Sequence, residues 1–464
     1  MNALLNTLRA RRPPGPRRPL TDALRRRPVS ARAPRGEEHG IVVLVRVLLL
    51  FESAMYSAVT PVLPHYAHVL HASKPAVGLL TASYPAGIVP GSLLGAWIAA
   101  RAGVRRTTLI GLLLFAVAII GFGLGNDIAV LDGLRFVQGM GCGFIWGGGL
   151  TWVIAVAPRE RRGTVLGSVM GAAIFGTLLG PVLGTLAVAV GTAPVFIVVG
   201  LVSFGLAAWT LRHPEPPAGW SQPSSSTPLR TLVRTPLILL GSWLILLEAA
   251  TVGATGTLIP LRLAHFGGSG ILIGATFLVA SLISMLVSTP IGRLVDRRGA
   301  GLPLATGLTM TAVLMVLLPL PQSAAALALL SIIALGGPLT AYTVPAISVI
   351  TEASERVGVP LVMATMLLNL AWAFGETLGA PAAANISQAT SDAVPLLMLS
   401  AIMVLTLWPV LRARLHRPGA AAVPAAERGP KPADGPWQPA FVDAADAPDE
   451  PSARPGDRAR ACTR

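Results

Sequence analysis

Residues 48–64 read LLLFESAMYSAVTPVLP, and residues 244–260 read LILLEAATVGATGTLIP. Both stretches are apolar, and in each of them a glutamate stands twelve residues before a proline. The two glutamates, Glu52 and Glu248, are 196 positions apart. A glutamate and a proline in one register within two apolar segments are hard to explain by chance, so the pair indicates an internal repeat.

The same offset relates further positions along the chain. Matching residues in the two halves are Gly78 with Gly274, Arg101 with Arg297, Gly103 with Gly299, and Gly111 with Gly307. Parallel repeats related by an axis along the membrane normal are the architecture of one large class of transporters. The repeat therefore predicts two pseudo-symmetric halves.

The composition of the chain is that of a membrane protein. Of 464 residues, 53% are apolar and 12% are charged, whereas a soluble protein carries about 25% charged residues. A membrane-spanning helix uses about 20 apolar residues, which leaves room for roughly twelve such helices. The two cysteines, Cys142 and Cys462, cannot make a disulfide-stapled secreted fold. We predict an all-α polytopic protein with twelve transmembrane helices in two six-helix bundles.

Apolar stretches alternate with short polar breaks. They predict helices at 41–63, 76–99, 104–125, 128–156, 164–190, 194–211, 236–260, 271–291, 302–320, 323–350, 360–383 and 394–411. We predict two six-helix bundles, at 41–211 and 236–411, joined by a Pro- and Ser-rich cytoplasmic linker at 212–235. A disordered basic tail at 1–40 precedes them, and a second disordered tail at 412–464 follows them.

Positive charges lie almost entirely on one side of this topology. Of 36 Lys and Arg residues, only Lys74 and Arg262 lie in loops of the opposite side, while Arg46 and Arg135 lie inside spans. Because cytoplasmic loops carry the excess of Lys and Arg, we expect a multi-pass inner (plasma) membrane protein with both termini in the cytoplasm. This distribution of the net charge of +15 argues against a nucleic-acid partner. The basic first 40 residues either contact anionic membrane lipid or form a disordered leader.

Two turns on the predicted cytoplasmic side share a pattern. The turn after the eighth helix reads GRLVDRRG, from Gly292 to Gly299, and its acid Asp296 can cap a helix end and pair with arginines. The matching turn after the second helix reads AARAGVRR and has Ala100 at the place of the acid. Positive-inside anchoring alone is the alternative reading of these arginines.

The fourth predicted helix carries RFVQGMGCG, from Arg135 to Gly143, with Gln138 three residues after the arginine. An arginine about seven residues inside a span lies roughly 10 Å deep, because a helix rises 1.5 Å per residue. Such an arginine is costly in lipid, so it must face the bundle interior or water. The alternative is a structural arginine that reaches outward to the interface.

The fifth predicted helix carries glycines at short intervals followed by a proline. These residues are Gly171, Gly176, Gly180, Pro181 and Gly184. Small residues four apart let helix backbones touch, and Gly-Pro bends a helix.

Together these features resemble the major facilitator superfamily, and within it the drug–proton antiporter branch. The resemblance covers about residues 41–411. It implies proton coupling through Arg135 and Gln138, and a helix-5 motif that seals exporters against leak. The first helix is similar to that of vesicular amine transporters, where an acid meets a cationic substrate, but its acid is Glu52 rather than Asp. Gating is implied at Arg101, Gly103, Gly176, Gly180, Pro181, Gly184, Gly292, Asp296, Arg297 and Gly299.

Three carboxylates lie inside predicted spans, at Glu52, Glu248 and Glu376. Burial favours the protonated form of a carboxyl group, and a cationic substrate favours the charged form. Proton and cation therefore compete for one carboxylate, and we expect this exchange at Glu52. A structural hydrogen-bonding role is the alternative for each acid. Further residues expected at the central site are Tyr56, Asn369 and Trp372.

The favoured function is a proton-coupled antiporter that exports small amphipathic molecules, such as drugs or antibiotics, by alternating access. Alternatives are a proton-coupled symporter for sugars, organic acids or other metabolites, and a non-transporting membrane sensor. We find no nucleotide-binding motif and expect neither an enzyme nor a cofactor. Three histidines, His65, His68 and His71, have no acid or cysteine beside them, so no metal is expected. The predicted partners are the substrate, protons and lipid, and the predicted state is a monomer.

The topology can be tested by cysteine labelling with a membrane-impermeant thiol reagent in intact cells. We expect Ser73→Cys to be labelled from outside, and Ser226→Cys and Gly299→Cys only after the membrane is opened. Labelling of Ser226→Cys in intact cells would contradict the predicted orientation.

Overall fold

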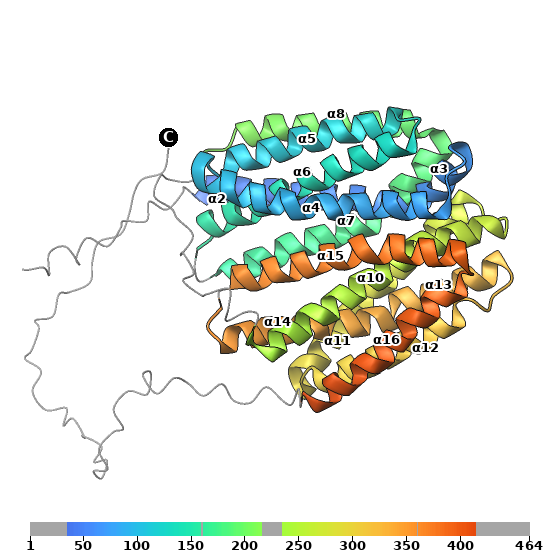
Figure 1. The fold of residues 1–464 in the computed structure, drawn as a ribbon. Helices are drawn as coiled ribbons and strands as arrows, with labels where there is room; N and C mark the ends of the chain where they lie inside the picture. The colour runs from blue at the N-terminus through green and yellow to red at the C-terminus, as the bar shows by residue number, and fades with distance from the viewer. Residues whose placement is uncertain (1–34, 159–160, 216–233, 360, 414–464) are drawn as a thin grey trace, which may run out of the picture. The chain divides into compact units, whose positions relative to one another are not determined.

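A computed structural model describes residues 35–158, 161–215, 234–359 and 361–413, and all of their regular secondary structure is helical. Figure 1 shows the helices of the first half on one side and those of the second half on the other. The first half contains α2 (Arg35–Ala58), η1 (Thr60–Val62), α3 (Leu63–Val69), α4 (Lys74–Ala102), α5 (Val104–Leu124), α6 (Ile128–Val156), α7 (Arg162–Val190) and α8 (Thr192–Leu211). The second half contains α10 (Pro236–His265), α11 (Gly270–Arg298), α12 (Gly301–Leu317), α13 (Ala324–Gly336), α14 (Pro338–Arg356), α15 (Leu361–Ala389) and α16 (Ala393–Arg412).

All twelve predicted helices are present. Ten helical stretches in the described residues are long and apolar enough to cross a membrane. The shorter apolar helix α12 and the 29-residue α15 complete the twelve. The fold is therefore the predicted all-α polytopic fold.

Two of the helices are interrupted where the sequence places prolines. The first span changes from α2 to η1 and α3 near Pro61 and Pro64, and the tenth divides into α13 and α14 before Pro338. Proline has no N–H to donate and its ring clashes with the preceding turn, so it favours the first turn of a new helix.

The ends of the predicted parts fall mostly outside the described residues. The tail at 1–34, the linker at 216–233 and the tail at 414–464 are among the residues that the structure does not describe. Helix α2 begins at Arg35, so residues 35–40, which the sequence places in the disordered tail, are helical. The division of the chain into bundles at 41–211 and 236–411 stays a prediction.

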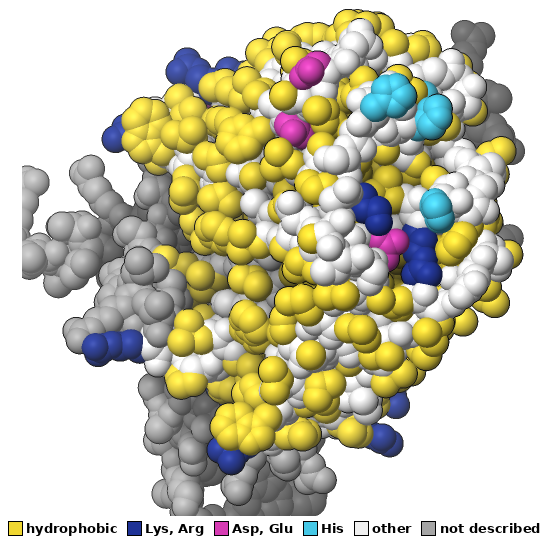
Figure 2. Space-filling model, turned by 45° about the vertical axis from the view of Figure 1, so that its right-hand side comes forward, with side chains coloured by type: hydrophobic (Ala, Val, Ile, Leu, Met, Phe, Trp, Pro, Cys, Tyr) yellow, Lys and Arg dark blue, Asp and Glu magenta, His cyan; other side chains and the backbone are white. Residues whose placement is uncertain are grey.

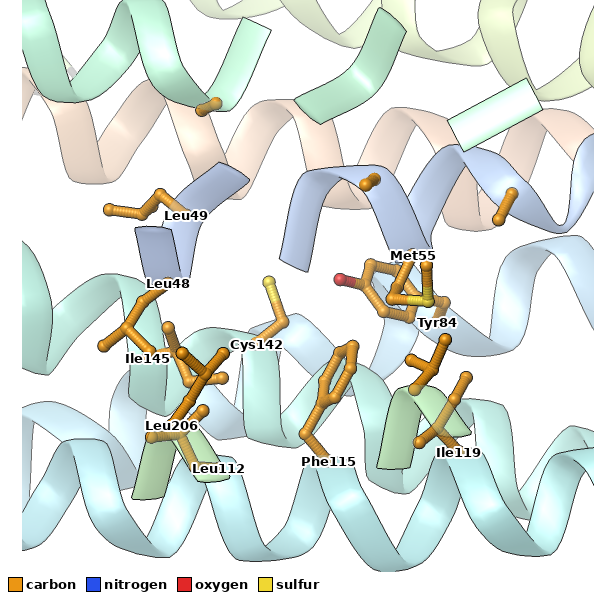
Figure 3. Packing of buried hydrophobic residues seen from close by; sticks show 14 of the residues in the cluster. Leu48, Leu49, Met55, Tyr84, Leu112, Phe115, Ile119, Cys142, Ile145 and Leu206 are labelled. Atoms are coloured by element: carbon orange, nitrogen blue, oxygen red, sulfur yellow. The ribbon is translucent and has the colours of Figure 1, made fainter. Parts of the chain in front are cut away.

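Each half has its own hydrophobic core. One cluster of buried residues runs from Ile41 to Ala207, and another runs from Leu244 to Val410. Figure 3 shows part of the first cluster, with Met55, Tyr84 and Phe115 packed together. Large apolar side chains also cover much of the surface (Figure 2), as expected where lipid is the solvent.

The glycines of α7 lie directly against the backbone of α2. A Cβ atom added at Gly176 would lie 2.1 Å from the Leu50 carbonyl oxygen. One added at Gly180 would lie 2.6 Å from the Ala54 carbonyl oxygen and 1.8 Å from the Ser57 hydroxyl. No side chain larger than hydrogen fits at these positions, so this glycine seam sets the distance between α2 and α7.

The second half repeats the glycine seam between α10 and α15. A Cβ atom added at Gly375 would lie 2.2 Å from the Leu246 carbonyl oxygen, and one added at Gly379 would lie 2.4 Å from the Ala250 carbonyl oxygen. Leu246 and Ala250 follow Leu50 and Ala54 by the same 196 residues as the glutamates. The two halves are thus built on matched helix pairs.

The seam can be tested with Gly180→Leu, and Gly171→Leu offers a matched control on the same helix. An added Cβ at Gly171 has no atom within 4 Å. Overpacking costs about 1–3 kcal/mol, so we expect a lower melting temperature in detergent for Gly180→Leu only. Equal melting temperatures for the two variants would show that the seam does not limit the approach of α2 and α7.

Candidate functional site

Three glutamates are buried in the middle of the helices. Glu52 in α2 and Glu376 in α15 are each 3% exposed, and Glu248 in α10 is 7% exposed. A carboxylate buried at such depth is costly unless it has partners. The partners of the three acids differ, and the difference defines the site.

Both oxygens of Glu52 accept hydrogen bonds from helices of its own half. The Tyr84 hydroxyl in α4 donates to Oε1, and Trp146 Nε1 in α6 donates to Oε2 over 2.7 Å. The Ser53 hydroxyl also lies 3.5 Å from Oε2. Glu52 therefore links α2, α4 and α6. The sequence did not predict the roles of Tyr84 and Trp146. It shows that both lie in apolar segments, but not which neighbouring helix their side chains face.

Arg135 lies next to the same tyrosine. Its guanidinium carbon is 4.5 Å from the centre of the Tyr84 ring, and Nη1 donates to Gln138 Oε1 over 2.7 Å. Arg135 is 2% exposed, and within the described residues neither its Nε nor Gln138 Nε2 has a hydrogen-bond partner. The predicted pair Arg135 and Gln138 is thus brought together, and Tyr84 connects it to Glu52.

Glu376 is held by a residue of the other half. The Tyr56 hydroxyl in α2 donates to Glu376 Oε1 over 2.7 Å. The Tyr56 ring lies 5.4 Å from the Tyr84 ring and packs edge-on at 5.4 Å against Trp372. The structure therefore brings Tyr56, Trp372 and Glu376 together beside the Glu52 cluster.

Among the described residues, Glu248 and Asn369 share no hydrogen bond or ring contact with this group. Glu248 Oε1 accepts a hydrogen bond of 3.1 Å from the Thr343 hydroxyl in α14, within the second half. Asn369 is exposed and lies three residues before Trp372 on α15. The repeat predicts equal depth for Glu52 and Glu248 but not their different partners.

The turn after α4 contains an acid that the sequence pattern lacks. Glu215, just after α8, accepts a hydrogen bond of 3.2 Å from the Arg105 backbone N–H, and its Oε2 lies 3.8 Å from Arg105 Nε. An added Cβ at Gly103, whose φ is +92°, would lie 2.2 Å from Glu215 Oε1. The turn after α4 has Ala100 at the position that corresponds to Asp296. The Glu215 carboxylate, from just after α8, therefore supplies an acid to this turn.

The charged gating candidates lie on the surface, whereas Gly299 is buried and Gly292 is half-buried. Arg101 is exposed and its guanidinium stacks 4.0 Å from the Trp97 ring centre. Gly299 takes the same left-handed backbone as Gly103, with φ +80°. Asp296 and Arg297 are exposed, and neither is in an ion pair with another described residue.

The two halves also meet at the end that carries Lys74. Lys74 Nζ lies 2.5 Å from Asp392 Oδ1 and 3.1 Å from the Ser387 hydroxyl, both in the second half. Beside it is a pocket of about 330 Å³, lined by Arg262, His265, Phe266, Pro319, Ser391, Asp392 and Ala393. Figure 2 shows basic side chains around an acidic one on this face.

The charge of Asp392 is stabilised by its neighbours. Burial alone would raise the pKa of the Asp392 carboxyl, but hydrogen bonds from Lys74 and Ser387 outweigh burial and hold the pKa below its ordinary value. Asp392 is therefore charged at neutral pH and its ion pair with Lys74 is intact.

Comparison with known proteins decides the family. The sequence model described as Major Facilitator Superfamily matches residues 47–376. The chain belongs to the major facilitator superfamily. It is therefore a multi-pass membrane transporter and not an enzyme, which leaves the alternative of a non-transporting sensor without support.

Related sequences cover nearly the whole described region. The chain is 27% identical over 382 residues to a protein named "Uncharacterized MFS-type transporter YcaD" from Escherichia coli O45:K1 (strain S88 / ExPEC). The match covers 82% of this chain and 97% of the relative. The same name and identity recur in Escherichia coli O81 (strain ED1a).

Solved structures share the fold at low sequence identity. A bacterial homologue of the human lysosomal transporter Spinster, described as inward-facing and unoccupied, has a TM-score of 0.68 at 13% identity, over 83% of this chain and 98% of its own. The nucleoside transporter NupG has a TM-score of 0.66 at 13% identity, over 80% and 98% of the two chains. A D-xylose-proton symporter has a TM-score of 0.64 at 16% identity, over 80% and 95%.

The Lys74–Asp392 pair can be tested by a double-mutant cycle with Lys74→Met and Asp392→Asn. We expect a coupling free energy of about 0.2–1 kcal/mol, because both groups are partly exposed. The pKa of Asp392 is lowered on folding, so the coupling should be constant from pH 8 to 5 and be lost only as the pH falls past the ordinary value of about 3.9 and through the lower pKa of the folded state. Additive effects of the two substitutions at pH 7 would show that the pair contributes nothing.

Proposed function

We propose that the chain is a proton-coupled antiporter that exports small amphipathic cations or neutral molecules, such as drugs or antibiotics. The observation that carries this proposal is a continuous group of buried polar and aromatic side chains that crosses from one half to the other. Glu52, Tyr84, Tyr56 and Glu376 follow one another through the hydrogen bonds and ring contacts described above. A buried acid in this group offers a place for a proton, and the rings offer surface to an amphipathic cargo.

Arg135 supports proton coupling at this group. A buried cation close to buried carboxylates stabilises their charged forms, so a proton that arrives or leaves changes the balance of charge around it. Arg135 Nε and Gln138 Nε2 have no partner among the described residues, so both can take a new partner when the charges change.

The glycine seam of α7 supports export rather than uptake. Gly176, Gly180 and Pro181 match the helix-5 motif associated with exporters of the superfamily, and the seam holds α7 against α2, the helix of Glu52. We propose that the Arg101 end faces the cytoplasm, in a bacterial inner membrane, as the charge distribution predicts. The bond between Lys74 and Asp392 then joins the two halves at the outer end, as in an inward-facing transporter. We propose that the transporter is a monomer.

Proton symport is the second candidate. It is favoured by the fold similarity to a D-xylose-proton symporter, with a TM-score of 0.64. Symport predicts that proton and cargo move in the same direction, whereas antiport predicts opposite directions. The direction of proton movement therefore separates the two.

The test uses everted membrane vesicles that are acid inside and contain the full chain. We expect a lipophilic cation such as ethidium to accumulate in them while protons leave. Arg135→Met should reduce this accumulation more than tenfold, since it removes the buried charge, and the exposed Arg356→Met is the matched control. Protons and cargo moving in one direction would favour symport. No flux of any cation or neutral compound in a broad panel would contradict the proposal.

A further inference from the structure

The three buried glutamates differ in whether a buried carboxylate oxygen lacks a hydrogen-bond partner among the described residues. Tyr84 and Trp146 engage both oxygens of Glu52, and Thr343 engages Glu248. Glu376 has Tyr56 on Oε1 only, and its Oε2 is buried without a hydrogen-bond partner among the described residues. An unpaired buried carboxylate oxygen costs free energy, so it is the oxygen most ready to accept a proton or a cation.

Two aromatic side chains lie next to Glu376, since Tyr56 donates to its Oε1 and the Tyr56 ring packs against Trp372. Tyr56 and Trp372 are both half-buried, and their rings pack edge to face 5.4 Å apart. Trp372 and Glu376 are four residues apart on α15, so they share one face of the helix. Asn369 extends the same face and is exposed. Aromatic rings attract organic cations through their negative faces, and a carboxylate adds the opposite charge.

We infer that Glu376, with the rings of Tyr56 and Trp372, forms the subsite for the positively charged group of the cargo. The ligand class is an organic cation with aromatic or aliphatic substituents. Glu52, whose oxygens are occupied, is instead a positioning residue that fixes Tyr84 and Trp146. This inference rests on the proposed transport of cations and goes beyond it by assigning the charge to the second half.

The subsite also connects cargo binding to the movement of the two halves. The Tyr56–Glu376 bond crosses between the halves, and a hydrogen bond to a charged carboxylate is about twice as strong as one to a neutral acid. A cation on Oε2 keeps Glu376 charged and preserves the Tyr56 bond, whereas a proton on Oε2 weakens it. The charged groups that act on Glu376 are Arg135 of α6 and Glu248 of α10.

Cation binding to the purified full chain in detergent tests the subsite. The probe is tetraphenylphosphonium, and triphenylphosphine oxide is its neutral counterpart. We expect Glu376→Gln to weaken binding of the cation at least tenfold and to leave the neutral compound unchanged, because only the charge is removed. Glu376→Asp should restore part of the preference for the cation. Glu352→Gln, an exposed acid of α14, is the matched control.

The outcomes separate the inference from the proposed function. Wild-type protein that neither binds nor exports any organic cation would overturn both. Cation binding that survives Glu376→Gln but is lost in a correctly folded Glu52→Gln would overturn the inference and leave export intact.

A second measurement uses the unaltered chain and does not depend on the folding of variants. A hydrophobic carbodiimide reacts with buried protonated carboxyl groups, and mass spectrometry locates the product. We expect modification at Glu376 that tetraphenylphosphonium suppresses, with little modification at Glu52. Modification of Glu52 that the cation suppresses, with Glu376 unaffected, would assign the subsite to Glu52 and overturn the inference.

Discussion

The hydrogen bond from the Tyr56 hydroxyl to Glu376 is the interaction on which the account of this transporter depends. It joins α2 of the first half to α15 of the second at a buried carboxylate, over 2.7 Å. Other polar bonds between the halves, such as Lys74 with Asp392 and Thr81 with Thr257, do not involve a buried glutamate. Tyr56 instead donates to Glu376, the acid that we propose to gain and lose the proton. We propose that transport and protonation meet in this bond.

This bond is placed by a symmetric scaffold that carries asymmetric chemistry. The seams α2–α7 and α10–α15 use glycines against carbonyl oxygens at matched positions of the repeat. The polar residues do not follow the repeat. Arg135 corresponds to Ser331, which is buried and donates a hydrogen bond to the Leu327 carbonyl oxygen of its own helix. Glycine packing fixes the distance between the two helices of each pair. It does not determine which charged side chains the helices carry, so the two halves can differ in their charges.

The fold was largely predictable from the sequence, because hydropathy, prolines and positive charges act locally. The twelve helices and the importance of Glu52, Arg135 and Gln138 as buried polar residues could be read directly. The second seam was missed because its motif is out of register with the rest of the repeat. FGTLLGP at 175–181 corresponds to FGETLGAP at 374–381, an offset of 199 rather than 196. The motif places Glu376 where the first half has Thr177.

The partners of the acids were not predictable, because they depend on which faces of distant helices meet. Tyr84 and Trp146 are ordinary aromatic residues of apolar helices until α4 and α6 turn them toward Glu52. Glu215 likewise reaches the turn at Gly103 from the end of α8, over 110 residues away. These contacts explain why equal sequence patterns around Glu52 and Glu248 gave unequal environments.

The most direct test of the central claim is the distance between spin labels at residues 101 and 297, one in each half, measured by pulsed electron resonance. We expect Tyr56→Phe, which removes only the hydroxyl, to move the distribution at high pH toward the one that wild-type protein adopts at low pH. Distributions in Tyr56→Phe that follow those of wild-type protein at every pH would contradict the claim.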